Sequence, residues 1–299
     1  MRWIKYLLLG VLFLSIVFTS TVSSVQATKP QKKQGNEEVM TLATWLWHTD
    51  LIESDQERIL TFLEQKQVTH LYLQIHPSVA RKSYQTFIQK LSAKNVEVHA
   101  LSGGPDWVLA GTETDAFFQW VMEYQKASKS NQKFKGIHLD VEPYLLPGWE
   151  NEEERNGIIK SYQQWLERSY RQAKQLGLPM EVDIPFWFDE IAYQNEDGQG
   201  YLAEWIIRKV DGVTIMAYRD TAEMIQVIVK QEMEWARIAG KKVFIAVETN
   251  PSVEAASVTF YEEGRLHMDQ QLRIVRDAYK GSSSFGGMAV HDLKSWLSF

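Results

Sequence analysis

Short runs rich in β-branched and aromatic residues alternate with longer amphipathic stretches along most of the sequence. Strict alternation of strands and helices indicates parallel strands joined by right-handed crossovers. An open doubly wound sheet shows the same alternation, but eight such units, without a glycine-rich phosphate loop after the first strand, favour a closed ring. We therefore expect an α/β fold, a single (β/α)8 TIM barrel of eight parallel strands. The expected strands are residues 42–47, 68–75, 96–101, 136–141, 180–184, 212–217, 243–247 and 287–290.

Two of the intervening stretches begin with the spacing of a capping box. Ser54 is followed three residues later by Glu57, and Asn151 by Glu154. The second stretch also carries an apolar stripe at helical spacing, which predicts one buried helix face. The stripe is Ile158, Tyr162 and Trp165.

The amino-terminal segment has the pattern of a secretory signal. Arg2 and Lys5 precede an apolar stretch, residues 7–18, and small and polar residues lead to Ala27. Twelve apolar residues are fewer than the roughly 20 of a membrane span, although a retained anchor is the alternative. We expect a signal peptide at residues 1–27, a polar tether at residues 28–40 and a barrel catalytic domain at residues 41–299, the usual size for this fold.

Charge and cysteine content limit the possible partners and compartments. The formal net charge is −6, and cleavage after Ala27 removes Arg2 and Lys5, which leaves −8. This charge argues against nucleic acid and suits a secreted monomer, extracellular or associated with the cell wall, that leaves the membrane after signal cleavage. There are no cysteines, so disulfides and thiolate chemistry are excluded.

A row of ionisable residues ends the fourth expected strand. Strand side chains alternate faces, so His138, Asp140 and Glu142 should project from one side, with Glu142 at the carboxyl end before Pro143. A buried charge without a partner is costly, so such a row is either a satisfied polar cluster or a catalytic apparatus with shifted pKa values. We favour the catalytic interpretation, because active sites of these barrels lie at the carboxyl ends of the strands.

The other strand ends are polar and aromatic as well. Carboxylates beside many aromatic side chains predict a carbohydrate-binding cleft, because sugar rings offer apolar faces for stacking and hydroxyls for hydrogen bonds. The expected substrate-binding residues are Gln74, Trp107, His138, Asp183, Trp187, Arg219, Glu248, His291 and Trp296.

Four short motifs at these strand ends resemble those of glycoside hydrolase family 18, the chitinase-like barrels. That family has Ser-x-Gly-Gly after the third strand, Asp-x-Asp-x-Glu on the fourth, Met-x-Tyr-Asp on the sixth and Gly-Gly at the eighth. The matching segments follow in the same order. They are Leu101-Ser102-Gly103-Gly104, His138-x-Asp140-x-Glu142, Met216-Ala217-Tyr218-Arg219 and Gly286-Gly287.

The resemblance implies a glycosidase with three catalytic residues and no cofactor or metal. Glu142 would be the general acid, Asp140 would orient a substrate acetamido group, and Tyr218 would hydrogen-bond its carbonyl. The acetamide oxygen would attack the anomeric carbon, so no protein nucleophile is needed. The two acids are close, so we expect Glu142 to hold a proton near neutral pH while Asp140 bears the charge.

Three positions depart from the family pattern. His138 replaces the inner acid of the signature, and Arg219 replaces the acid after the tyrosine. His291 stands where the family's eighth strand usually offers a tryptophan. These departures predict a divergent member acting on a polysaccharide or glycan that need not be chitin.

Three alternatives remain at the level of sequence. Glu142 and Glu248 match the acid/base and nucleophile of retaining barrel glycosidases, which requires carboxyl groups roughly 5–5.5 Å apart. Histidines near strand ends, with Asp140 or Asp292, give a metal-dependent hydrolase as a second alternative. These histidines are His48, His76, His138 and His291. A sugar-binding barrel without turnover is the third, although Glu142, Asp140 and Tyr218 are all present.

Overall fold

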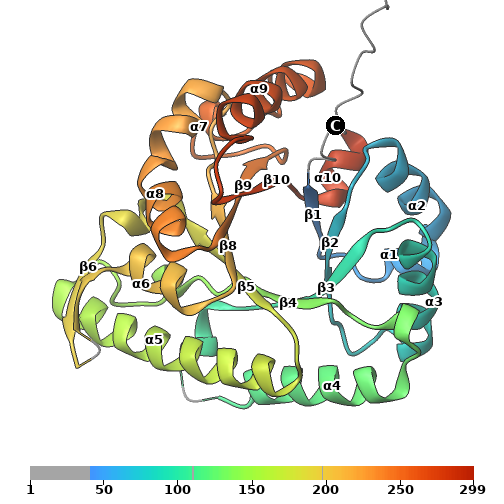
Figure 1. The fold of residues 1–299 in the computed structure, drawn as a ribbon, viewed down its shortest axis with the longest axis horizontal. Helices are drawn as coiled ribbons and strands as arrows, with labels where there is room; N and C mark the ends of the chain where they lie inside the picture. Colours follow the sequence, from blue (N-terminus) through green and yellow to red (C-terminus); the bar gives the residue numbers. More distant parts are fainter. Residues whose placement is uncertain (1–40, 110, 197) are drawn as a thin grey trace, which may run out of the picture. The chain divides into compact units, whose positions relative to one another are not determined.

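The computed structural model describes residues 41–109, 111–196 and 198–299, and these form a closed barrel of eight parallel strands. The strand order around the ring is β1-β10-β9-β8-β5-β4-β3-β2, and Figure 1 shows the helices arranged around it. The (β/α)8 prediction is therefore confirmed. The expected signal peptide and tether lie outside the described residues.

All eight expected strands are confirmed, with shifts of one to a few residues at their ends. The strands are β1 Leu42–Leu46, β2 His70–Gln74, β3 Glu97–Ser102, β4 Gly136–Leu139, β5 Met180–Pro185, β8 Gly212–Met216, β9 Lys242–Glu248 and β10 Phe285–His291. The sequence did not predict the antiparallel hairpin of β6 Ala192–Asn195 and β7 Gly198–Tyr201, which lies between β5 and the next helix.

Helices connect successive strands and cover the outside of the barrel (Figure 1). They are α1 Leu51–Ser54, α2 Gln56–Gln65, α3 Arg81–Ser92, α4 Glu113–Ala127, α5 Glu152–Gln175, α6 Leu202–Lys209, α7 Ala222–Ile228, α8 Lys230–Ala239, α9 Gly264–Tyr279 and α10 Leu293–Ser298. Short 3₁₀ turns follow four strands at the carboxyl end of the barrel. They are η1 Pro105–Val108, η3 Pro143–Leu145, η4 Phe186–Asp189 and η5 Ala256–Val258. Within the described residues, no helix combines the length and apolar character of a membrane span.

One of the two expected helix starts is confirmed and the other is wrong. Asn151 caps α5, because its side chain accepts hydrogen bonds from the backbone N–H groups of Glu153 and Glu154. Ser54 instead ends the short α1, and its hydroxyl donates to the carbonyl of Asp50. The expected stripe on α5 faces the core. Tyr162 and Trp165 are buried, and Ile158 packs against the core.

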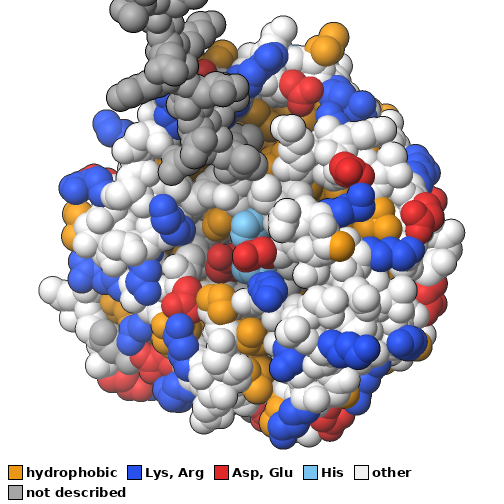
Figure 2. Space-filling model, turned by 45° about the vertical axis from the view of Figure 1, so that its right-hand side comes forward, with side chains coloured by type: hydrophobic (Ala, Val, Ile, Leu, Met, Phe, Trp, Pro, Cys, Tyr) orange, Lys and Arg blue, Asp and Glu red, His pale blue; other side chains and the backbone are white. Residues whose placement is uncertain are grey.

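The barrel interior is unusually polar for a buried core. Its apolar members form one small cluster, Ala43, Trp45, Tyr72, Leu101, Ala246 and Ala289. His99, His138, Asp183 and Thr214 are buried as well. Burying a polar group without a hydrogen-bond partner costs free energy, so these side chains are expected to pair with one another inside the barrel. The molecular surface is mixed in charge, and Figure 2 shows basic and acidic side chains interspersed on one face.

Candidate active site

The row His138, Asp140 and Glu142 lies on and just beyond β4, at the carboxyl end of the strands. His138 is fully buried inside the barrel, whereas Asp140 and Glu142 are partly exposed. The end of β3 holds this segment, because the backbone N–H of Asp140 donates to the carbonyl of Ser102 over 3.0 Å. The charges of His138 and Glu142 both act on Asp140. This is consistent with the prediction that the three side chains project from one side of the strand.

The glycine after Ser102 is required by close backbone packing. A Cβ atom on Gly103 would lie 1.7 Å from the carbonyl oxygen of Asp140, a distance that no side chain can occupy. The Ser-Gly-Gly segment therefore lets β3 approach the acidic turn closely enough to fix the backbone of Asp140.

We expect Gly103→Ala to destabilise the fold by about 1–3 kcal/mol, the usual cost of overpacking, because the backbone of Asp140 must move. Urea unfolding measures this loss. Gly157→Ala is the matched control, since a Cβ there meets nothing within 4 Å on an exposed face of α5 and should stabilise by about 0.5–1 kcal/mol. A Gly103→Ala protein as stable as the parent would show that the turn is not tightly held.

Asp183 on β5 joins the row from the neighbouring strand. His138 Nε2 lies 2.8 Å from Asp183 Oδ1, and the indole N–H of Trp45 donates to Asp183 Oδ2 over 3.0 Å. His138 Nδ1 also lies 3.6 Å from Glu181 Oε2. The His138 ring stacks on Tyr72 with 3.6 Å between ring centroids. Both carboxylate oxygens of Asp183 therefore have hydrogen-bonding partners, and the ring of His138 lies between Asp183 and Glu181.

Burial and neighbouring charges shift the pKa values of this cluster. Burial alone would lower the pKa of His138, but Asp183 and Glu181 raise it to about 9, so His138 is a cation near neutral pH. Burial, with the charges of Asp183 and Glu142, raises the pKa of Asp140 well above its usual range. Burial, with the charge of Asp183, also raises the pKa of Glu142.

These shifts do not match the predicted division of charge between the two catalytic acids. We expected a protonated Glu142 beside a charged Asp140. In the structure, the raised pKa values favour the uncharged forms of both Asp140 and Glu142. The carboxylate that lies against the cationic His138 is Asp183. His138 is thus the counterion of Asp183 rather than a neighbour that keeps Asp140 charged.

Tyr144 fixes the orientation of Glu142. Its hydroxyl donates to Glu142 Oε1, and its ring meets Trp187 edge to face with centroids 5.1 Å apart. Trp187 is partly exposed, as a cleft-lining residue should be. The hydrogen bond leaves Glu142 Oε2 as the oxygen available to a substrate.

Glu248 and His291 form a second pair at the ends of β9 and β10. His291 Nδ1 lies 2.8 Å from Glu248 Oε2, and Glu248 Oε1 accepts from the backbone N–H groups of Thr249 and Asn250, both over 2.7 Å. Burial alone would raise the pKa of Glu248, but His291 and Asn250 lower it. Conversely, burial would lower the pKa of His291, yet Glu248, Asp292 and Asp140 raise it to about 9.

Three further predicted residues lie at the same end of the barrel. Tyr218, after β8, packs against the interior cluster with its ring 6.1 Å from that of His291. Arg219 covers the ring of Phe186 and donates to the carbonyl of Tyr218. Gln74 ends β2, and its side-chain oxygen accepts a hydrogen bond from Thr49.

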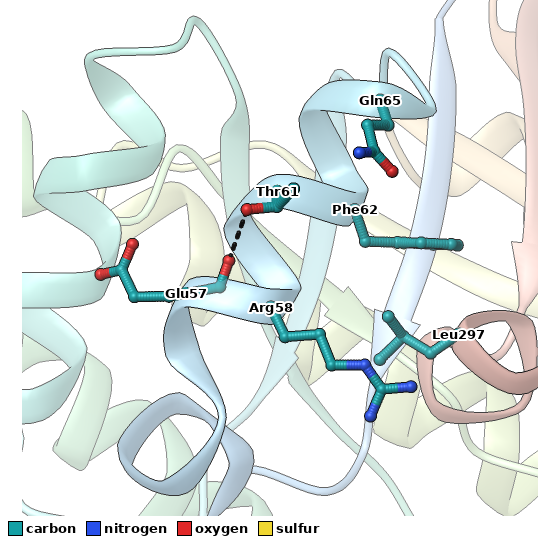
Figure 3. A pocket seen from close by; sticks show the side chains of 6 residues that line it. All are labelled: Glu57, Arg58, Thr61, Phe62, Gln65 and Leu297. Atoms are coloured by element: carbon teal, nitrogen blue, oxygen red, sulfur yellow. Dashed lines mark hydrogen bonds between the residues drawn. The ribbon is translucent and has the colours of Figure 1, made fainter.

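Two tryptophans predicted to line the cleft are buried elsewhere. Trp107 is 8% exposed and packs against Phe117 of α4. Trp296 is 2% exposed and meets Phe62 of α2 edge to face. The next residue, Leu297, lines a hollow between α2 and α10 on the outside of the barrel, where Figure 3 shows it opposite Arg58. The cleft-lining prediction for Trp107 and Trp296 is therefore wrong.

The four histidines proposed as metal ligands are not brought together. His48 and His76 are exposed, and His76 Nδ1 lies 2.6 Å from the Ser78 hydroxyl. Among the described residues, no cluster of potential ligand atoms includes these two, His138 or His291. The structure thus gives no support to a metal-dependent hydrolase built on these residues.

Sequence reasoning did not assign a role to four residues that shape the site. Trp45, Tyr72 and Glu181 surround His138 and Asp183, and Tyr144 holds Glu142. Trp45, Tyr72 and Glu181 each lie two residues before a predicted or strand-end residue, namely Trp47, Gln74 and Asp183. For these three, that spacing was the available signal, because alternate strand residues share a face.

Comparisons with known proteins support the fold. No protein-family model matches the sequence, and no curated protein matches it. Among solved structures, a chitinase from Chromobacterium violaceum is similar with a TM-score of 0.51 and 11% identity, over 87% of this chain and 97% of that one. A GH18 chitinase from Pseudoalteromonas aurantia is similar with a TM-score of 0.51 and 12% identity, over 86% of this chain and 97% of that one. A plant class V chitinase mutant from Cycas revoluta, in complex with (GlcNAc)3, is similar with a TM-score of 0.50 and 13% identity, over 86% of this chain and 96% of that one.

The chain therefore has the barrel fold of the glycoside hydrolase family 18 chitinases, as the strand-end motifs predicted. At sequence identities of 11–13%, this similarity shows a shared fold.

Proposed function

We propose that the protein is a secreted glycoside hydrolase that cleaves a glycan containing N-acetylated amino sugars, with Glu142 as the general acid. The observation that carries this proposal is the state of Glu142. It lies at the carboxyl end of the barrel, Tyr144 holds one of its oxygens, and burial raises its pKa. A raised pKa favours the protonated form of a carboxylic acid, and protonation of a glycosidic oxygen requires that form.

Substrate assistance is favoured over a protein nucleophile. Glu248, the candidate nucleophile, has both oxygens engaged by its own loop and by His291. An acetamido oxygen can instead attack the anomeric carbon while Glu142 protonates the leaving oxygen. The positive charge that develops on the acetamide would be offset by the negative charge of Asp183, which acts on both Asp140 and Glu142.

Asp183 supplies a buried acid beside His138, the residue that replaces the inner acid of the family signature. It is 4% exposed and its negative charge raises the pKa of both Asp140 and Glu142. His138 neutralises Asp183 in turn, so the cluster tolerates three carboxyl groups without holding three unpaired charges.

The mechanism can be tested with two kinds of inhibitor. A thiazoline that mimics the cyclic acetamide intermediate should inhibit hydrolysis competitively, whereas a fluorosugar that traps nucleophiles should leave Glu248 unlabelled. Covalent labelling of Glu248, with no thiazoline inhibition, would favour the retaining mechanism instead.

Removal of the Tyr144 hydroxyl should change the pH dependence of hydrolysis. Tyr144 lowers the pKa of Glu142 through its hydrogen bond, so Tyr144→Phe raises that pKa further. A general acid is active only while protonated, and its activity is lost as the pH rises through its pKa. The basic limb of the kcat/KM profile should therefore shift to higher pH in Tyr144→Phe. Tyr201→Phe, at an exposed tyrosine, should leave the profile unchanged. An unchanged or downward shift in Tyr144→Phe would argue against Glu142 as the acid.

A further inference from the structure

A second cluster of ionisable side chains lies at the opposite end of the barrel from Glu142. His70 begins β2 and pairs in register with Glu97, the first residue of β3, and His99 is two residues further along β3. One potential ligand atom from each of the three lies within 4.8 Å of the others. Amino ends of barrel strands are the end that these folds do not use for catalysis, so the cluster is separate from the candidate active site.

The spacing of these atoms fits a metal better than a hydrogen bond. His70 Nε2 lies 3.5 Å from Glu97 Oε2, beyond the 2.7–3.2 Å range of good hydrogen bonds. Two ligands at about 2.0–2.1 Å from a tetrahedral zinc ion are roughly 3.4 Å apart. The two atoms therefore already stand at the separation that a shared ion would impose.

The ring of His70 is held in the orientation that a ligand needs. Its Nδ1 lies 3.0 Å from the hydroxyl of Thr69, so Nε2 is the nitrogen left to face Glu97. Such partners behind a ligating imidazole fix its tautomer and direction.

His99 is fixed by packing and by a buried acid. A Cβ atom on Gly136 would lie 2.8 Å from His99 Nδ1, so the ring rests against a position that only glycine leaves open. His99 Nδ1 is buried without a hydrogen-bond partner and lies 3.4 Å from Glu181 Oε2, which is buried and unpartnered as well. A carboxylate behind a histidine is the usual support of a zinc-binding imidazole.

We propose that His70, Glu97 and His99 bind one divalent transition-metal ion of the zinc class, with water as the fourth ligand. The ion links β2 to β3 at the amino end of the barrel and stabilises the closed ring. Glu97 is exposed and His70 is partly exposed, so an ion can reach the site from solvent.

The test is zinc titration of the metal-depleted full chain by calorimetry, with thermal unfolding as a second measurement. We expect one zinc ion per chain, no comparable binding of magnesium, and a higher Tm with zinc. Glu97→Gln and His70→Gln should each weaken zinc binding at least tenfold and abolish the rise in Tm. His48→Gln and His76→Gln, at exposed histidines elsewhere, should bind zinc as the parent does.

Two outcomes would overturn the proposal. One is the absence of saturable zinc binding to the parent chain, and the other is zinc binding that Glu97→Gln leaves unchanged. Glu97 is exposed, so its variant tests the site even if His70→Gln fails to fold. Glycan hydrolysis should persist in chelator, because the cluster lies away from Glu142.

Discussion

Glu142→Gln should lower kcat for glycan hydrolysis by about 10²–10⁴-fold, the usual contribution of a general acid. The amide is nearly isosteric with the carboxylic acid but cannot give up a proton to the leaving oxygen. Binding of the glycan should persist, because Tyr144 and Trp187 still shape the site around residue 142. Initial rates at saturating substrate measure the loss, and calorimetry with the same glycan measures binding.

Glu262→Gln is the matched control for this experiment. Glu262 is exposed in the segment before α9, so the same substitution there should leave kcat unchanged. If Glu142→Gln and Glu262→Gln hydrolyse the glycan equally well, Glu142 is not the acid and the proposed mechanism fails.

His138→Leu should destabilise the barrel by about 3–5 kcal/mol, the usual cost of removing one partner of a buried ion pair. His138 is fully buried and lies 2.8 Å from Asp183 and 3.6 Å from Glu181. Leucine fills much of the volume of the ring, but it leaves two acids without their counterion. Chemical unfolding in urea at neutral pH measures the change.

The control for the His138 experiment is His76→Leu. His76 is exposed, so the same substitution should change the stability by no more than about 0.5 kcal/mol. Equal stabilities of the two variants would mean that His138 does not neutralise Asp183 and Glu181. The electrostatic explanation for the raised pKa values of Asp140 and Glu142 would then need revision.

The strands of the barrel could be predicted from sequence because each is a short apolar run bounded by polar turns. The β6–β7 hairpin could not, because its residues are largely exposed and carry no apolar alternation. Ser54 was misassigned as a helix cap because α1 and α2 are separated only by Asp55, and the local pattern does not show that interruption.

The site could be predicted where its residues are close together in the sequence. His138 lies on β4, and Asp140 and Glu142 follow it at alternate positions, so the expectation of a common face comes from strand geometry alone. The contact of Asp183 with His138 joins residues 45 positions apart and depends on the register of β4 and β5. Trp296 was misplaced because it follows the last strand on α10, where its helix face directs it outward to α2. The division of charge between Asp140 and Glu142 could not be predicted either, because it depends on Asp183, which lies on a different strand.

Hydrolysis of matched N-acetylated and de-N-acetylated amino-sugar oligosaccharides, with the anomer of the first product followed by NMR, tests the central claim most directly. The acetamide oxygen attacks one face of the anomeric carbon, and water then displaces it from the other. We therefore predict cleavage of the acetylated oligosaccharides alone, with retention of the anomeric configuration. An inverted product, or equal cleavage of oligosaccharides that lack the acetyl group, would contradict acid catalysis by Glu142 with assistance from the substrate.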